Sequence, residues 1–146
     1  MSKTTTNEPI GFLLERTTRI VKLQFHKAFK NLKVDMTPEQ WVVMDALFQK
    51  NDQPQKHLAD SSYKNAPTIS RIIDVLSKKG WVERKMSDQD RRVYIISQTK
   101  EGKAIYKKVI GEVERLRNLG WKGLTNKDYK EFKRIINQIF ANYEQE

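Results

Sequence analysis

Apolar residues recur at the helical period near both ends of the chain. Between residues 10 and 32 they fall three or four positions apart, which predicts a long amphipathic helix with one apolar face. The same spacing predicts a helix over 100–118 and a last helix from residue 126. The first stripe fits either an ordinary core or half of a subunit interface. The last stripe is broad and aromatic, which favours a partner surface, and its members are Tyr129, Phe132, Ile136, Ile139, Phe140 and Tyr143.

Two further helices are predicted between residues 37 and 62. Thr37 can cap the start of the first, Pro38 suits its first position, and Gln40 can reach back to the backbone of the cap. Residues 51–54 interrupt the pattern, and a shorter helix follows over 55–62. The inward-facing residues expected in these two helices are Trp41, Met44, Leu47, Phe48, Leu58 and Ala59.

The stretch from Asn65 to Thr99 changes its period in the middle. A helix is predicted from Asn65, which can cap it, to Gly80, which can turn left-handed and end it. After Gly80 the period falls to two, which predicts a two-stranded hairpin over 81–86 and 93–97 with a polar loop between the strands. A short helix pair followed by such a hairpin is the order of parts in a winged helix-turn-helix. The apolar stripe that supports the helix consists of Ile69, Ile72, Ile73 and Leu76.

A polar-faced helix beside a hairpin with arginines at its tip matches the two grooves of DNA. The helix fits the major groove, and an arginine-bearing loop reaches phosphates or the narrow minor groove. Arg71 can instead brace the module through an acidic neighbour such as Asp74, and Ser70 can be a small surface residue. The candidates are Thr68, Ser70 and Arg71 for base edges, and Lys64 and Asn65 for phosphates.

The pattern of this stretch resembles that of one family. LAxxxxxxxxTISRIIDxLxKKGWVER, followed by SDQDRRVYIISQTKEG, is similar to the MarR (multiple antibiotic resistance regulator) family, and the resemblance covers nearly the whole chain. It implies one domain over 1–146, mainly α-helical with a small β-hairpin. The winged helix-turn-helix would span about 37–99, and dimerisation helices over about 8–33 and 100–146 would flank it.

One corner departs from the family's pattern. Ser62 and Tyr63 stand where an apolar residue and then a glycine-like turn are usual. Either Tyr63 packs across this turn, or the turn has a different geometry.

The tip of the hairpin carries Asp90, Arg91 and Arg92. The family has an aspartate–arginine pair in its wing, and the match implies that Asp90 orients the tip while at least one arginine contacts the DNA backbone or minor groove. Asp90 itself would repel phosphate, so we expect it to form an ion pair that holds an arginine in place. The alternative is a solvated surface pair, which would contribute little to stability.

The resemblance implies a homodimeric, sequence-specific DNA-binding transcriptional regulator. With one winged helix per subunit, such a dimer prefers a pseudo-palindromic site whose half-sites lie about one helical turn apart. Family members often repress transcription and release DNA when a small aromatic or anionic ligand binds, so a repressor with such an effector is implied, with no ligand-binding residue assigned. The alternative is a winged-helix module for non-specific DNA binding or protein interaction.

Charge and composition narrow the classes of partner. The net charge of +10 favours polyanions such as double-stranded DNA, and no exposed basic amphipathic helix is predicted for a membrane surface. The chain has no cysteine, and its two histidines lack nearby ligands, so no metal or cofactor is expected. No catalytic motif supports an enzyme.

Residues 1–11 lack the apolar core of a signal peptide, and no apolar run in the sequence is long enough to span a membrane. We therefore expect a cytoplasmic protein with a frayed N-terminal tail.

Overall fold

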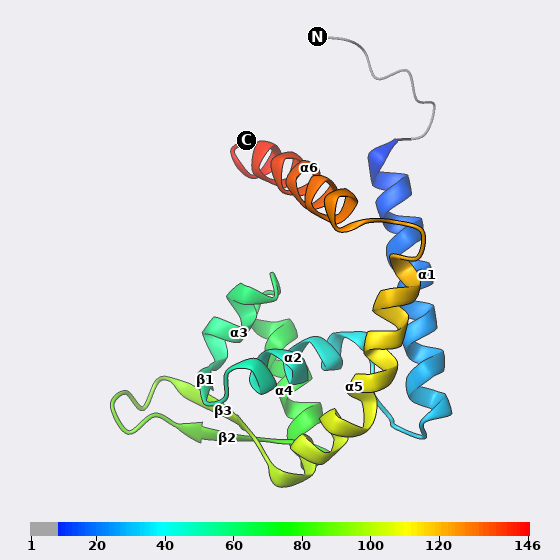
Figure 1. Cartoon of the computed structure of the whole chain (residues 1–146). Coiled ribbons are helices and arrows are strands. Elements are labelled where there is room, and N and C mark those ends of the chain that lie inside the picture. The colour runs from blue at the N-terminus through cyan, green and yellow to red at the C-terminus, as the bar shows by residue number, and fades with distance from the viewer. Residues whose placement is uncertain (1–8) are drawn as a thin grey trace. The chain divides into compact units, whose positions relative to one another are not determined.

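The computed structural model describes residues 9–146, and these contain six α-helices and three strands (Figure 1). Residues 1–8 of the expected tail lie outside this range. The chain forms two compact units, Met1–Glu112 and Val113–Glu146. The elements are α1 (Ile10–Asn31), α2 (Pro38–Gln49), β1 (Gln53–Pro54), α3 (Gln55–Ser61), α4 (Ala66–Lys78), β2 (Val82–Met86), β3 (Tyr94–Gln98), α5 (Lys100–Gly120) and α6 (Asn126–Glu144).

The helix starts follow the capping residues predicted from the sequence. In α2 the Thr37 hydroxyl accepts the N–H of Gln40, and the Gln40 side chain accepts the N–H of Thr37, both at 3.1 Å. Asn65 caps α4 in the same way by accepting the N–H of Thr68 at 2.9 Å. Because each cap satisfies an N–H group that the helix itself leaves unpaired, the ends of α2 and α4 are set by local chemistry.

The core of the first unit lies between α2, α3, α4 and the sheet. Ile69, Ile73 and Leu76 of the α4 stripe are buried, as predicted, whereas Ile72 is half-buried. Leu58 and Ala59 of α3 are also buried. Burial of these apolar side chains removes the stripe of α4 from water and leaves its polar face outside. The position of α4 on the module therefore follows from the spacing of its isoleucines.

Aromatic rings join α1, α2 and α5 within the first unit. Trp41 is 4% exposed, and its ring stacks on Tyr106 with the centroids 4.9 Å apart. The ring of Phe29 also lies near Trp41, with the centroids 6.3 Å apart. Phe48, predicted to be buried, is instead 44% exposed and stacks on Tyr106 at 3.9 Å. It covers the end of the aromatic row, where Tyr106 of α5 contacts one face of its ring, and part of the ring stays exposed to solvent.

The sheet has three strands rather than the predicted two. Its order is β1-β3-β2, all antiparallel, and Arg84 of β2 and Gln53 of β1 both lie opposite Ile96 of β3. The strand β1 has only two residues, too few for an alternating pattern to show in the sequence. It is fixed by side-chain bonds: the amide of Gln53 donates to the backbone carbonyls of Ala46 and Lys50, at 3.0 and 2.6 Å.

The start of α5 lies directly on the backbone that leads into β2. Thr99 caps the helix by accepting the N–H of Gly102 at 3.0 Å, and its own N–H donates to the carbonyl oxygen of Trp81 at 3.1 Å. Gly102 is buried, and a Cβ built on it would stand 2.0 Å from that oxygen. Only a residue without a side chain fits this approach of two backbones.

The turn between α3 and α4 keeps the left-handed conformation expected of a glycine, although Tyr63 occupies it. Tyr63 has φ +53°, and its side chain is 78% exposed. Both alternatives drawn from the sequence are therefore wrong: the ring is too exposed to pack across the turn, and the glycine-like geometry is retained. A β-carbon in this region is strained by the neighbouring carbonyl oxygen, at a cost of about 1–2 kcal/mol for an ordinary residue.

We expect Tyr63→Gly to raise the free energy of unfolding by about 1 kcal/mol, because glycine adopts positive φ without this strain. Urea denaturation of the two proteins measures the difference. Tyr63→Ala is the matched control, since it removes the ring but keeps the β-carbon. A glycine variant no more stable than the alanine variant would contradict the assignment of strain to this turn.

The second unit contains the end of α5 and the whole of α6. The ring of Trp121 packs edge-on against Tyr129 and Phe132, with centroid distances of 5.0 and 5.9 Å. No residue of α6 is buried, and its aromatic stripe is largely exposed. No helix among residues 9–146 is long and apolar enough to cross a membrane.

Candidate nucleic-acid interface

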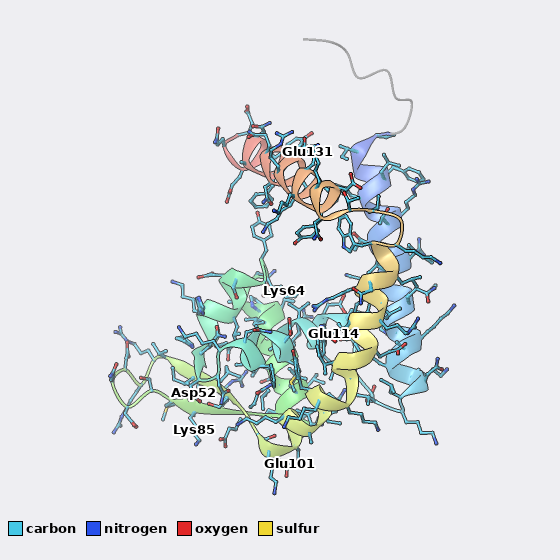
Figure 2. The ribbon with its side chains drawn as sticks, viewed as in Figure 1. Asp52, Lys64, Lys85, Glu101, Glu114 and Glu131 are labelled. Carbon is cyan, nitrogen blue, oxygen red and sulfur yellow. The ribbon has the colours of Figure 1, made fainter. Side chains whose placement is uncertain are left out.

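Polar side chains occupy the first turns of α4 and the turn before it. Arg71 is exposed, and its Nη2 donates to the hydroxyl of Thr68 at a distance of 3.5 Å. Ser70 is half-buried, and Asn65 is exposed, although its side-chain oxygen Oδ1 accepts the capping hydrogen bond. Lys64, also half-buried, lies in the α3–α4 turn (Figure 2). All five candidates predicted on this helix and its approach are therefore brought to one end of α4.

Asp74 on α4 pairs with a residue of the wing and not with Arg71. Its Oδ1 accepts from Nη1 of Arg84 at 2.7 Å. The structure thus lacks the Arg71–Asp74 brace that the sequence left open. The guanidinium of Arg71 remains at the polar surface of α4.

The wing loop between β2 and β3 projects away from the helices of the first unit (Figure 1). Asp90 and Arg92 form the expected ion pair: Nε and Nη2 of Arg92 donate to the two carboxylate oxygens at 3.1 and 3.3 Å. The side-chain hydrogen bond from Arg92, with a second from its backbone N–H, lowers the pKa of Asp90. The carboxylate therefore stays charged and keeps the guanidinium in place under mildly acidic conditions.

Both wing arginines point into solvent. The side chain of Arg92 is 89% exposed even though it is paired. Arg91 is exposed and has no ion pair within residues 9–146. The loop that carries them is held by Ser87, whose hydroxyl accepts the N–H groups of Gln89 and Asp90 at 3.2 and 3.4 Å. Two cations thus stand on a tip with a defined backbone conformation.

A cleft of about 490 Å³ separates the helix pair from the base of the wing. It brings together three of the predicted residues, Lys64, Asn65 and Arg92, whereas the other five lie outside its lining. Lys56 of α3 also lines it and was not predicted, because its position relative to the wing depends on the folded arrangement. Asp60 is the one acidic residue in this lining.

The charge of the cleft suits an extended anion. Three cationic residues, Lys56, Lys64 and Arg92, line the cleft, and so do Asn65 and Ala66 at the start of α4. Positive charge at a helix start and on a neighbouring loop is what binds successive phosphates of a nucleic acid. Within the described residues, no group of three or more His, Asp or Glu side chains could hold a metal ion.

Comparisons with known proteins agree on one family. The sequence model of the MarR family matches residues 36–94. The chain is 31% identical over 100 residues to the uncharacterized HTH-type transcriptional regulator YdcH of Bacillus subtilis, a match that covers 66% of this chain and 67% of YdcH. It is 29% identical over 85 residues to the transcriptional repressor MprA of Escherichia coli, covering 58% of this chain and 47% of MprA. The chain thus aligns with about half the length of MprA.

Solved structures of low sequence identity share the fold. The Staphylococcus aureus MepR–DNA complex has a TM-score of 0.85 at 17% identity, with 93% of this chain and 99% of that one covered. The Streptomyces coelicolor regulator PcaV, solved with its natural ligand, has a TM-score of 0.82 at 18% identity, with 97% and 98% covered. The mainly helical winged-helix fold predicted from the sequence is confirmed by these similarities.

Proposed function

The chain belongs to the MarR family of transcriptional regulators, and on that premise we propose that it is a homodimeric, sequence-specific DNA-binding repressor released by a small ligand. The observation that carries the proposal is that exposed Arg71 on α4 and the two exposed wing arginines belong to one unit. A helix and an adjacent cationic loop of this kind fit a major groove and the phosphates or minor groove beside it.

In this proposal the two elements have different tasks. Thr68, Ser70 and Arg71 contact base edges and supply specificity, and Arg91 contacts the backbone or minor groove. Asp90 holds Arg92 over the cleft, where it meets phosphate together with Lys64 and Asn65. In this proposal residues 37–99 form the DNA-binding part of a single domain. The protein works in the cytoplasm and has neither a cofactor nor an enzymatic activity.

Exposed apolar surface supports a homodimer. On α1 it includes Ile10, Phe12, Ile20 and Val21, between 45% and 52% exposed, and on α6 Tyr129, Phe132 and Tyr143 are between 45% and 74% exposed. Such faces cost free energy in water and favour burial against a second copy of the chain. Residues 8–33 and 100–146 would then form the two-fold interface, which requires a pseudo-palindromic DNA site.

The ligand remains defined by class alone. PcaV binds a natural ligand, and MprA is a repressor. We call α4 the recognition helix, because it is the helix proposed to enter the major groove. We propose a small aromatic or anionic effector that binds the dimer conformation in which the two recognition helices are wrongly spaced for DNA. No residue is assigned to it.

The alternative function, a module for non-specific DNA binding or protein interaction, has support in the net charge of +10. Selection of bound fragments from random DNA separates the two functions. We expect a palindromic motif that binds orders of magnitude more tightly than bulk duplex at fixed salt. If selection enriches no motif, the repressor proposal is wrong and the non-specific module is favoured.

A further inference from the structure

We propose that Arg84 is a positioning residue that holds the recognition helix at a fixed distance from the wing, and thereby sets how sharply the protein discriminates between DNA sequences. The inference rests on the proposed function, because it assigns α4 and the wing to the same DNA site. Arg84 is not among the predicted DNA contacts, and its own side chain is only 24% exposed.

One guanidinium contacts three elements of the module. Nε of Arg84 donates to Oε1 of Gln55 at the start of α3, at 3.0 Å. Nη1 donates to Oδ1 of Asp74 on α4 at 2.7 Å, and Nη2 donates to the backbone carbonyl of Ser70 at 3.4 Å. The guanidinium carbon also lies 5.4 Å from the centre of the Tyr94 ring on β3. A single side chain of β2 therefore ties α3 and α4 to both long strands.

These contacts require an arginine. The planar guanidinium presents several N–H donors in a fixed fork and stacks on an aromatic face, whereas a lysine ammonium is a point charge that cannot reach three separated acceptors. Because the fork is rigid, a shift of α4 along the wing would break at least one bond. The geometry of Arg84 thus opposes sliding of the recognition helix.

The pair with Asp74 also adjusts the charge of the helix that would enter the groove. Asp74 is 49% exposed on α4, and an unpaired carboxylate there would repel DNA phosphate. The guanidinium of Arg84, which is mostly buried, offsets the charge of this carboxylate. The wing therefore neutralises the one acidic residue of α4 without placing a further cation on its outer face.

The neighbouring residue of β2 provides a matched control. Lys85 follows Arg84 directly, so its side chain points to the opposite face of the strand. Its side chain, labelled in Figure 2, is 68% exposed, and its one ion pair among residues 9–146 is with Glu83 of the same strand, at 3.4 Å. Arg84→Met and Lys85→Met remove the same charge from adjacent positions, but only the first breaks contacts with α3 and α4.

The first measurement uses DNA. With a selected site and a scrambled duplex at fixed salt, we expect Arg84→Met to lower the ratio of specific to non-specific affinity at least tenfold, and Lys85→Met to change that ratio less than twofold. Arg84→Lys keeps the charge, so we expect non-specific affinity to persist while the ratio falls several-fold. An Arg84→Lys variant that is folded and keeps the wild-type ratio would overturn the proposal.

The second measurement needs no DNA. The chain has no cysteine, so spin labels can be attached to Ser77→Cys of α4 and Gln89→Cys of the wing without other labelled sites. Dilution of labelled protein into unlabelled protein then restricts the measured distance to the two labels within one subunit. We expect a broader distance distribution in Arg84→Lys and in the milder Asp74→Asn than in Lys85→Met. An unchanged distribution in both would overturn the proposal. A broadened distribution together with no preferred sequence for the wild type would instead reject the repressor function and leave the positioning role standing.

Discussion

Gly102→Ala is expected to lower the free energy of unfolding by about 3 kcal/mol, the upper end of what overpacking usually costs. The added methyl group would stand 2.0 Å from the carbonyl oxygen of Trp81, and the obstructing atom is backbone, which cannot rotate away. Relief requires α5 to move off the start of the hairpin. That movement breaks the hydrogen bond from the N–H of Thr99 to Trp81.

Gly111→Ala is the matched control for this prediction. Gly111 lies within the same helix, and its added β-carbon would meet no atom within 4 Å. Alanine there should stabilise the protein by about 0.5–1 kcal/mol, because it restricts the unfolded chain and favours helix. Urea denaturation gives both values. Equal stabilities for the two variants would mean that the close approach of α5 to Trp81 is not a feature of the protein in solution.

The second large effect concerns the wing. Arg91→Ala combined with Arg92→Ala should weaken binding to every duplex more than tenfold near physiological salt. It should also flatten the plot of log affinity against log salt by about 0.9 for each DNA phosphate that the wing no longer neutralises. Arg91 has no ion pair within the described residues, so we expect its single substitution to cost more than that of Arg92, which already pairs with Asp90.

A second pair of adjacent cations separates this effect from simple loss of charge. Lys107 and Lys108 are exposed neighbours on α5, away from the wing and the cleft. Their double alanine variant has the same net charge as the wing variant. Because α5 belongs to the proposed two-fold interface, light scattering must first show that this variant keeps the oligomeric state of the wild type. Fluorescence anisotropy at several salt concentrations should find a wild-type slope for it. If both double variants flatten the slope equally, the wing has no special contact with DNA.

Local sequence signals predicted the parts of the fold that depend on near neighbours. Thr37 and Asn65 begin helices because each accepts a hydrogen bond from a backbone N–H three residues away. The strand β1 and the partial exposure of Phe48 depend on residues far along the chain, on Ile96 and Tyr106, so no local pattern contained them. The fold was predictable where its determinants lie within one or two helical turns.

The residues of the candidate site also divide into those that could be predicted from the sequence and those that could not. The residues at the start of α4 and at the wing tip could be proposed from charge and position. The ion pair of Asp90 with an arginine was expected from the family resemblance, and because an unpaired Asp90 would repel phosphate. Arg84 and Lys56 could not be singled out, since their partners lie on other elements. Which of the predicted residues contacts DNA stays a prediction, to be decided by binding measurements.

The aromatic row of the first unit gives the protein a built-in optical probe. Of its three tryptophans, Trp41 lies in that row against Tyr106, and Trp121 lies in the second unit against Tyr129. In a Trp81→Phe background each remaining indole emits from a different unit. Tryptophan fluorescence, with Trp41→Phe or Trp121→Phe to assign each signal, would then show whether effector or DNA changes the environment of one unit before the other, without any attached dye.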